Sequence, residues 1–138
     1  MPFQLEIVTP EKRVLSESVD SVVLPGSEGE LGILPSHIPL VTALSPGELS
    51  YSKSGKTEHF AIGTGFVEVT GERVSVLTDM ALIENEIDEK TVEAALERAQ
   101  ARLLEIKQDS GSEEVALVMA MIQKSTAQLH LKRRRRSL

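Results

Sequence analysis

Residues 25–44 read PGSEGELGILPSHIPLVTAL, and this stretch says more about the fold than any other part of the chain. It holds three glycines and three prolines in twenty positions, yet it is rich in leucine, isoleucine and valine. Flexible linkers avoid large apolar side chains, and proline removes a hydrogen-bond donor from a strand. We therefore expect a rigid, sharply bent and largely buried ribbon rather than a linker or an ordinary strand.

Around this stretch, the first part of the chain alternates apolar and polar residues between frequent turn signals. Residues 3–8 alternate from the start, and pairs of alternating segments flank the turn dipeptides Ser54-Gly55 and Gly71-Glu72. These patterns predict two hairpins. Short strands with turns about every 8–12 residues predict an antiparallel β-sandwich or flattened barrel over residues 1–84. Glycines at positions 63 and 65 interrupt a strand pattern, which indicates a bulge or a close backbone approach.

Residues 85–138 follow a helical period instead and predict an antiparallel two-helix hairpin. Asp88 suits the N-cap of the first helix, and Ile87 and Val92 suit a hydrophobic staple. A break at residues 109–112 separates two helices of similar expected length. The apolar stripes that should face each other are Val92, Ala95, Leu96, Ala99, Leu103 and Ile106 in the first helix, and Val115, Val118, Met119, Ile122 and Leu129 in the second. The fold class is therefore α+β in two parts.

Charge is divided unevenly along the chain, whose formal net charge is −6. Residues 81–114 carry ten acidic and four basic side chains, whereas residues 115–138 carry six basic and no acidic ones. In an antiparallel hairpin the basic end of the second helix lies near the start of the first. We expect it beside Glu84, Glu86, Asp88 and Glu89. Exposed ion pairs are weak, so the hairpin should be closed but movable.

Composition excludes several classes of function. The chain has no cysteine, which removes thiolate metal sites and thiol catalysis. It has three phenylalanines, one tyrosine and no tryptophan, too few for base-stacking platforms. No apolar run approaches the roughly 18 residues of a membrane span, and the N-terminus does not resemble a signal peptide. The histidines at positions 37, 59 and 130 show no metal-ligand spacing, and no nucleophile–base set is evident.

The motifs together resemble the epsilon subunit family of bacterial F-type ATP synthases. The resemblance rests on GSEGELGILPxHxPLxT in residues 26–42, on GTGFVEV at 63–69, on VSVLTD at 74–79 and on Ile87-Asp88. These motifs cover nearly the whole chain in the family's order. The resemblance implies a non-catalytic central-stalk subunit, peripheral on the cytoplasmic face of the cell membrane. It would couple rotation of the c ring and gamma subunit to ATP synthesis in a proton-translocating complex.

The resemblance also implies roles for particular residues. Glu28, Glu30, His37 and Pro39 would form the interface with the gamma subunit and the c ring. The helical hairpin would lie on the sandwich or extend along gamma and restrain ATP hydrolysis. The basic tail, Lys132, Arg133, Arg134, Arg135 and Arg136, would then choose between the chain's own acids and an acidic segment of the catalytic beta subunit. For His37 a packed or interface histidine is preferred to a catalytic one.

Some family members bind ATP as a regulatory ligand through an Ile/Leu-Asp-x-x-Arg-Ala motif. Here Asp88 is present and Arg98 falls near a second arginine of the pattern, but Thr91-Val92 replaces Arg-Ala. Losing that arginine removes a charged phosphate donor. We therefore expect neither ATP nor any other cofactor to be bound, and keep Asp88 and Arg98 as the candidate ATP residues.

Two other functions remain open from the residues alone. One is a stand-alone adaptor with a β-sandwich and a coiled hairpin. The other is a nucleic-acid binder that uses the KRRRR tail, although the acidic balance and the scarcity of aromatic residues disfavour it. Copurification with a gamma subunit would distinguish the central-stalk subunit from both of these alternatives.

Overall fold

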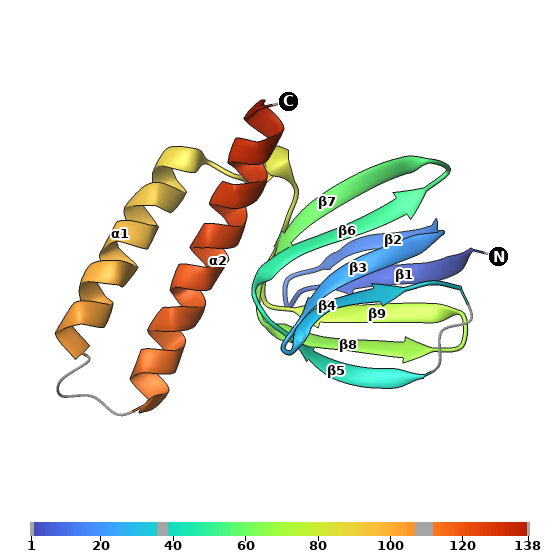
Figure 1. Ribbon diagram of the computed structural model, residues 1–138, viewed down its shortest axis with the longest axis horizontal. Helices are drawn as coiled ribbons and strands as arrows, with labels where there is room; N and C mark the ends of the chain where they lie inside the picture. The colour runs from blue at the N-terminus through green and yellow to red at the C-terminus, as the bar shows by residue number, and fades with distance from the viewer. Residues whose placement is uncertain (1, 36–38, 107–111, 138) are drawn as a thin grey trace.

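The computed structural model describes residues 2–35, 39–106 and 112–137, except for the side chains of 112 and 135–137. It confirms a β-sandwich followed by a helical hairpin (Figure 1). The strands are β1 (Phe3–Val8), β2 (Arg13–Val19), β3 (Ser21–Gly26), β4 (Gly29–Ile33), β5 (Leu40–Leu44), β6 (Gly47–Lys53), β7 (Lys56–Ile62), β8 (Gly65–Thr70), β9 (Arg73–Thr78) and β10 (Ala81–Leu82). The helices are a 3-10 turn η1 (Glu84–Glu86), α1 (Glu89–Ile106) and α2 (Ser112–Ser137).

The strands form two layers that are joined at one point. The first sheet runs β10-β7-β6-β3-β4 and the second runs β5-β8-β9-β1-β2. A single register pair, Gly26 with Leu44, joins β3 to β5. The pairing is antiparallel as predicted except between β1 and β9, which run parallel. A parallel pair needs a long crossover, and here the whole remainder of the sandwich supplies it.

One apolar core fills the space between the two sheets. The predicted alternation is confirmed in β1, where Phe3, Leu5 and Ile7 are buried. Leu49 from the first sheet is fully buried in the same cluster. Both predicted hairpins are present, since β6 turns into β7 at Ser54-Gly55 and β8 into β9 at Gly71-Glu72. The sandwich is thus a continuous, closely packed body.

The stretch at residues 25–44 departs from our expectation of a largely buried ribbon. It completes β3 and forms β4 and β5, so it contains two ordinary strands. Ile33 and Leu44 are buried, whereas Leu34 and Val41 are 65% and 67% exposed. Pro25 lies near the end of β3 and Pro39 just before β5, positions at which a strand tolerates the loss of a donor. The ribbon is bent, but much of it lies at the surface.

Gly63 and Gly65 mark close approaches, as their place in the strand pattern predicts. A Cβ on Gly65 would lie 1.9 Å from the carbonyl oxygen of Leu77 on the paired strand β9. A Cβ on Gly63 would lie 2.0 Å from Oδ1 of Asp79 and 3.1 Å from Cε of Lys124 in α2. The second contact shows that the hairpin reaches this corner of the sandwich.

The start of the hairpin follows the predicted chemistry. The Asp88 carboxylate accepts a hydrogen bond from the Thr91 backbone at 3.2 Å, so it caps α1 as expected. Ile87 and Val92 are both buried in one cluster, which confirms the staple. The break at 109–112 lies almost entirely outside the described residues.

Most of the two facing stripes is confirmed. Ala99 and Ile106 of α1 pack with Val118 of α2, whereas Met119 is 41% exposed and is not among the residues of that cluster. The helices also differ in length, 18 residues against 26. Leu129 and Leu131 of α2 are buried in one cluster with Val92 of α1 and Ala61 of β7, so this part of α2 packs against both α1 and the sandwich. No described helix is long and apolar enough to cross a membrane.

Candidate functional site

The hairpin meets the sandwich through α2, which lies between α1 and the strands (Figure 1). The apolar part of this contact is small. We call it the docking cluster and define it as the buried residues Ala61, Ile87, Val92, Leu129 and Leu131. Ala61 of β7 and Leu131 of α2 have no exposed surface at all. Ion pairs lie around this cluster, and three partly buried apolar side chains pack against it: Met80, Leu82 and Leu96.

The basic end of α2 is held by acids on both sides. Lys132 Nζ lies 3.1 Å from the Glu84 carboxylate in η1. Arg133 contacts Glu89 at 3.1 Å and Glu93 at 2.8 Å, both in α1. The hydrogen bonds from Arg133 to Glu89 and then Glu93 raise the pKa of its guanidinium, so it stays charged. Arg133 thereby ties the two helices together, and Lys132 ties α2 to the end of the sandwich domain.

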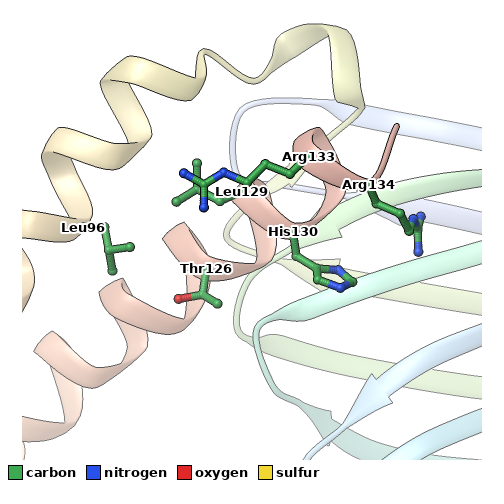
Figure 2. Close-up of a pocket in the computed structure, with 6 residues that line it drawn as sticks. All are labelled: Leu96, Thr126, Leu129, His130, Arg133 and Arg134. Carbon is green, nitrogen blue, oxygen red and sulfur yellow. The ribbon is translucent and has the colours of Figure 1, made fainter. Parts of the chain in front are cut away.

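Arg134 turns the other way, toward the strands (Figure 2). Its Nη2 donates to Oε1 of Glu48 in β6. Nδ1 of His59 in β7 lies 2.8 Å from the same oxygen, and Nδ1 of His130 in α2 lies 3.4 Å from Oε2. The Glu48 side chain is only 17% exposed. One nearly buried carboxylate of the sandwich therefore receives two groups from the hairpin and one from its own sheet.

A second ionic contact lies near the middle of α2. Lys124 Nζ contacts Oδ2 of Asp79, just after β9. Thr64 holds that carboxylate from the sandwich side, through its backbone amide at 3.1 Å and its hydroxyl at 3.0 Å. The absence of a side chain at Gly63 leaves room for the Lys124 stem. The site is therefore preformed on the sandwich, and α2 supplies the cation.

The expected partners of the basic end are half confirmed. Glu84 and Glu89 contact it, as predicted. Glu86 instead accepts from the Ile83 backbone and Asp88 caps α1. Sequence reasoning missed two partners of the basic end, Glu48 and Glu93, and also missed Asp79, the partner of Lys124. Glu93 follows Glu89 by four residues on one helix face and was predictable, whereas the two sandwich acids carry no such signal. The side chains of Arg135 and Arg136 lie outside the described residues.

A hollow of about 400 Å³ opens between the two helices close to this basic end (Figure 2). Its lining residues are Leu96, Thr126, Leu129, His130, Arg133 and Arg134. The candidate ATP residues Asp88 and Arg98 are not among them. Asp88 is engaged as the N-cap, and Arg98 is exposed on α1. The cations at the hollow are drawn toward carboxylates, Arg133 to Glu93 and Arg134 to Glu48.

A different surface lies on the outer face of the second sheet. Phe66 and Leu77 are register partners on β8 and β9, and they are 59% and 51% exposed. Ala43 of β5 and Val8 of β1 continue the row on either side. Val41, 67% exposed, lies two residues from Ala43 on the same strand face. We call these five residues the apolar stripe. Contiguous exposed apolar surfaces are typical of interaction sites.

The predicted interface residues lie elsewhere on the sandwich. Glu28 is exposed at the turn between β3 and β4, and Glu30 is exposed on β4. Pro39 is exposed just before β5, close in sequence to Val41 of the apolar stripe. His37 lies outside the described residues. Across the described part of the chain, no cluster of three or more His, Cys, Asp or Glu side chains is arranged to hold a metal ion.

Comparison with known proteins places this architecture in one family. The family model for the ATP synthase delta/epsilon chain β-sandwich domain matches residues 2–84. The ATP synthase epsilon chain of Herpetosiphon aurantiacus is 43% identical over 137 residues, which cover 99% of this chain and 98% of that one. The epsilon chain of Carboxydothermus hydrogenoformans is 53% identical over 101 residues, covering 73% and 75% of the two chains.

Solved structures agree. A chain of the Euglena gracilis mitochondrial ATP synthase, in a structure of OSCP, F1 and c-ring, superposes with a TM-score of 0.75 at 26% identity, covering 91% of this chain and 78% of that one. A chain from the Tetrahymena thermophila mitochondrial central stalk and c-ring shares the fold, with a TM-score of 0.58 at 14% identity and coverage of 91% and 95%. The family model, these relatives and the shared fold show that the chain belongs to the family of ATP synthase epsilon chains.

Proposed function

We propose that this chain is a non-catalytic subunit of the central stalk in a proton-translocating F-type ATP synthase. Its sandwich would transmit rotation between the c ring and the gamma subunit, and its hairpin would restrain ATP hydrolysis. As part of the complex it would be peripheral on the cytoplasmic face of the cell membrane. Family membership and the solved stalk structures that share its fold support this proposal.

The observation that carries the proposal is the way the hairpin is attached. The sandwich core spans both sheets, whereas the hairpin is attached by the smaller docking cluster, by the partly buried apolar side chains packed against that cluster, and by ion pairs to Glu48, Asp79 and Glu84. A hairpin that buried a large apolar surface on the sandwich would be costly to release. A small apolar contact with ion pairs around it is less costly to break, so another partner can replace it. This is the construction expected of an arm that leaves one partner for a second.

The apolar stripe is our candidate surface for the gamma subunit. Phe66 lies at its centre, and aromatic residues at the centre of an interface contribute most of the binding energy. Phe66→Glu should therefore weaken binding of a gamma subunit by at least roughly tenfold. Because Phe66 is 59% exposed, the isolated variant should still fold with an unchanged circular dichroism spectrum. Affinity is measured with purified chains by surface plasmon resonance or calorimetry.

Leu104→Glu serves as the matched control for that experiment. Leu104 is 74% exposed but lies on α1, away from the sandwich. The control should keep full affinity for gamma. If Phe66→Glu and Leu104→Glu bind gamma equally well, the apolar stripe is not the gamma surface. If the unmodified chain fails to bind gamma at all, the stalk assignment itself is wrong and a stand-alone adaptor is the better reading.

For the c ring we keep the acidic turn of β3 and β4 as the candidate contact. Glu28 and Glu30 are exposed there, so they are available to polar loops of a ring. His37 and Pro39 stay candidates for the side that faces gamma. Cysteines introduced at Glu30 and at Thr57, an exposed residue on the far strand β7, distinguish the contact. In the assembled complex, crosslinking to the c ring is expected from position 30 and not from position 57.

The restraining role is assigned to the basic tail, which would bind an acidic segment of the catalytic beta subunit when the hairpin extends. Replacing Lys132, Arg133, Arg134, Arg135 and Arg136 with Gln should relieve inhibition of ATP hydrolysis in the reconstituted complex. Unchanged inhibition would refute the role. The variant also removes the ion pairs that hold the hairpin closed. Greater inhibition would therefore mean that the basic tail stabilises the closed hairpin and does not bind the beta subunit.

ATP remains outside the proposed function. The sequence lacks the Arg-Ala pair of the family motif, and the carboxylates Glu89 and Glu93 already engage Arg133. Equilibrium dialysis of the full chain against millimolar ATP is expected to show no saturable binding. Binding that the Arg98→Gln substitution abolishes would overturn this expectation.

A further inference from the structure

The Glu48 carboxylate and the two histidines around it form a cluster of which the proposed function uses only the ion pair between Glu48 and Arg134. Glu48 and His59 belong to the sandwich, on paired strands β6 and β7, whereas His130 and Arg134 belong to the hairpin. We propose that Glu48 is the docking residue for the basic end of the hairpin and that His59 sets its effective charge. Docking of the hairpin would then weaken as the pH falls from 8 to 5.5.

The geometry places His59 and Arg134 in competition for one oxygen. Nη2 of Arg134 donates to Oε1 of Glu48, and Nδ1 of His59 lies 2.8 Å from that same oxygen. The His59 nitrogen is buried, with no well-aligned hydrogen bond to any group that the structure describes. A proton added to the imidazole therefore has one carboxylate beside it, and that carboxylate is the one Arg134 needs.

The sign follows from the charge of the sandwich side. With His59 neutral, the sandwich offers Arg134 a full negative charge on a side chain that is only 17% exposed. With His59 protonated, the sandwich offers a neutral pair, and the new cation also repels the guanidinium. In the undocked hairpin the Arg134 guanidinium is hydrated and lies away from His59, so this repulsion is absent. Imidazole changes its charge between pH 5 and 8, so this exchange falls in an accessible range.

His130 acts with the opposite sign but less strongly. It is carried by α2, and its protonation would add attraction to Glu48, whose Oε2 lies 3.4 Å away. The His130 side chain is 67% exposed, so solvent screens this attraction. His59 is 23% exposed and is screened less. His59, the less exposed of the two histidines, should therefore dominate the pH dependence.

The other charged groups around the cluster are carboxylates and cations of the neighbouring elements. Glu30 of β4 lines a second hollow together with Glu48, His59, His130 and Arg134, and Glu58 precedes His59 on β7. Glu84 of η1 faces Lys132, and Glu89 and Glu93 of α1 face Arg133. Imidazole is the side-chain group that ordinarily changes its charge between pH 5 and 8, so the experiment spans this range.

The test measures docking in the full chain without any other subunit. The chain has no cysteine, so Glu72→Cys on the sandwich and Gln100→Cys on α1, both exposed positions, accept a pair of spin labels or fluorophores. The distance distribution reports the docked fraction. His37→Gln in every variant removes the third histidine. The docking equilibrium constant should fall roughly tenfold between pH 8 and pH 5.5.

Three substitutions separate the roles within the cluster. His59→Gln should abolish most of that fall, and His130→Gln should keep it or steepen it. Glu48→Gln should lower docking at pH 8 and leave little pH dependence. A wild-type docking constant that does not change with pH, or a His59→Gln variant that keeps the full fall, overturns the proposal.

The pH dependence of docking does not depend on the proposed function. The proposed function gives only its consequence in the complex, where the hairpin would be released more readily in acid. Docking is measured on the isolated chain, whereas gamma binding and inhibition are measured in the complex. A flat pH profile would leave the stalk assignment intact. Failure to bind gamma would leave the His59 effect intact.

Discussion

The interior of the sandwich and the contact between the sandwich and the hairpin are stabilised by different interactions. Inside the sandwich, one apolar core reaches from β1 in the second sheet to β6 and β7 in the first. Between the sandwich and α2, five buried residues are ringed by ion pairs. Apolar burial is not screened by dissolved ions, whereas ion pairs that solvent reaches are weakened by salt. The molecule therefore has one body that resists deformation and one arm whose contact is exchangeable.

The largest effect should come from the sandwich core. Leu49 is fully buried, so Leu49→Ala leaves a cavity that cannot collapse easily, and should lower the free energy of unfolding by about 2–5 kcal/mol. Urea denaturation of the full chain measures this. Leu117→Ala on α2, where the leucine is 68% exposed, is the control and should change stability by less than about 0.5 kcal/mol.

A smaller loss is expected from the docking cluster. Leu131 is also fully buried, but it sits between the hairpin and the sandwich. Leu131→Ala should separate the arm rather than unfold the body, because undocking costs less than global unfolding. Hydrogen exchange should rise in α1 and α2 and stay unchanged in β1, β8 and β9. Equal acceleration in the sandwich strands would mean that the two regions form one cooperative unit.

A third change acts at the corner where the two regions touch. Gly63→Ala places a Cβ 2.0 Å from Oδ1 of Asp79 and 3.1 Å from Cε of Lys124. Displacing that carboxylate should cost about 1–3 kcal/mol and loosen α2. Asp79→Ala in the Gly63→Ala background tests the cause, since most of the clash disappears with the carboxylate. Stability that falls further in the double variant would contradict this explanation.

The smallest effect should come from the tip of the hairpin. Arg102 of α1 contacts Glu105, at 3.2 Å, and Glu114 of α2. The Glu114 and Glu105 hydrogen bonds raise the pKa of Arg102, but the group is exposed. Arg102→Gln should weaken helix pairing slightly, and only at low salt. Comparing helicity of wild type and variant at low and at 0.5 M salt checks this, with convergence expected at high salt.

Sequence reasoning succeeded where local rules decide. The period of two in β1, the turns at Ser54-Gly55 and Gly71-Glu72, and the Asp88 cap all follow from residues close together in the chain. It failed where burial depends on a distant layer. Val41 and Leu34 look like core residues, but the second sheet places Val41 on its outer face and Leu34 lies beyond the end of β4.

The contacts of the candidate site also include some that the sequence predicts and some that it does not. The sequence itself carries the charge asymmetry, and an antiparallel hairpin brings the basic end to Glu84 and Glu89, so those contacts were predictable. Glu48 was not, because it lies 86 positions from Arg134 and looks like any polar residue on a strand. Met119 was misplaced because the apolar period of α2 does not say which stripe meets α1 and which stays exposed.

By itself the sequence determined the element types, the caps and turns, the family and the distribution of charge, since each depends on neighbours within a few residues or on motif order. The tertiary structure alone decided which acids receive the basic end, where the apolar stripe is exposed and how Gly63 admits Lys124. These contacts join residues that only the stacking of two sheets and the docking of α2 bring within a few ångströms, and no local period encodes that approach.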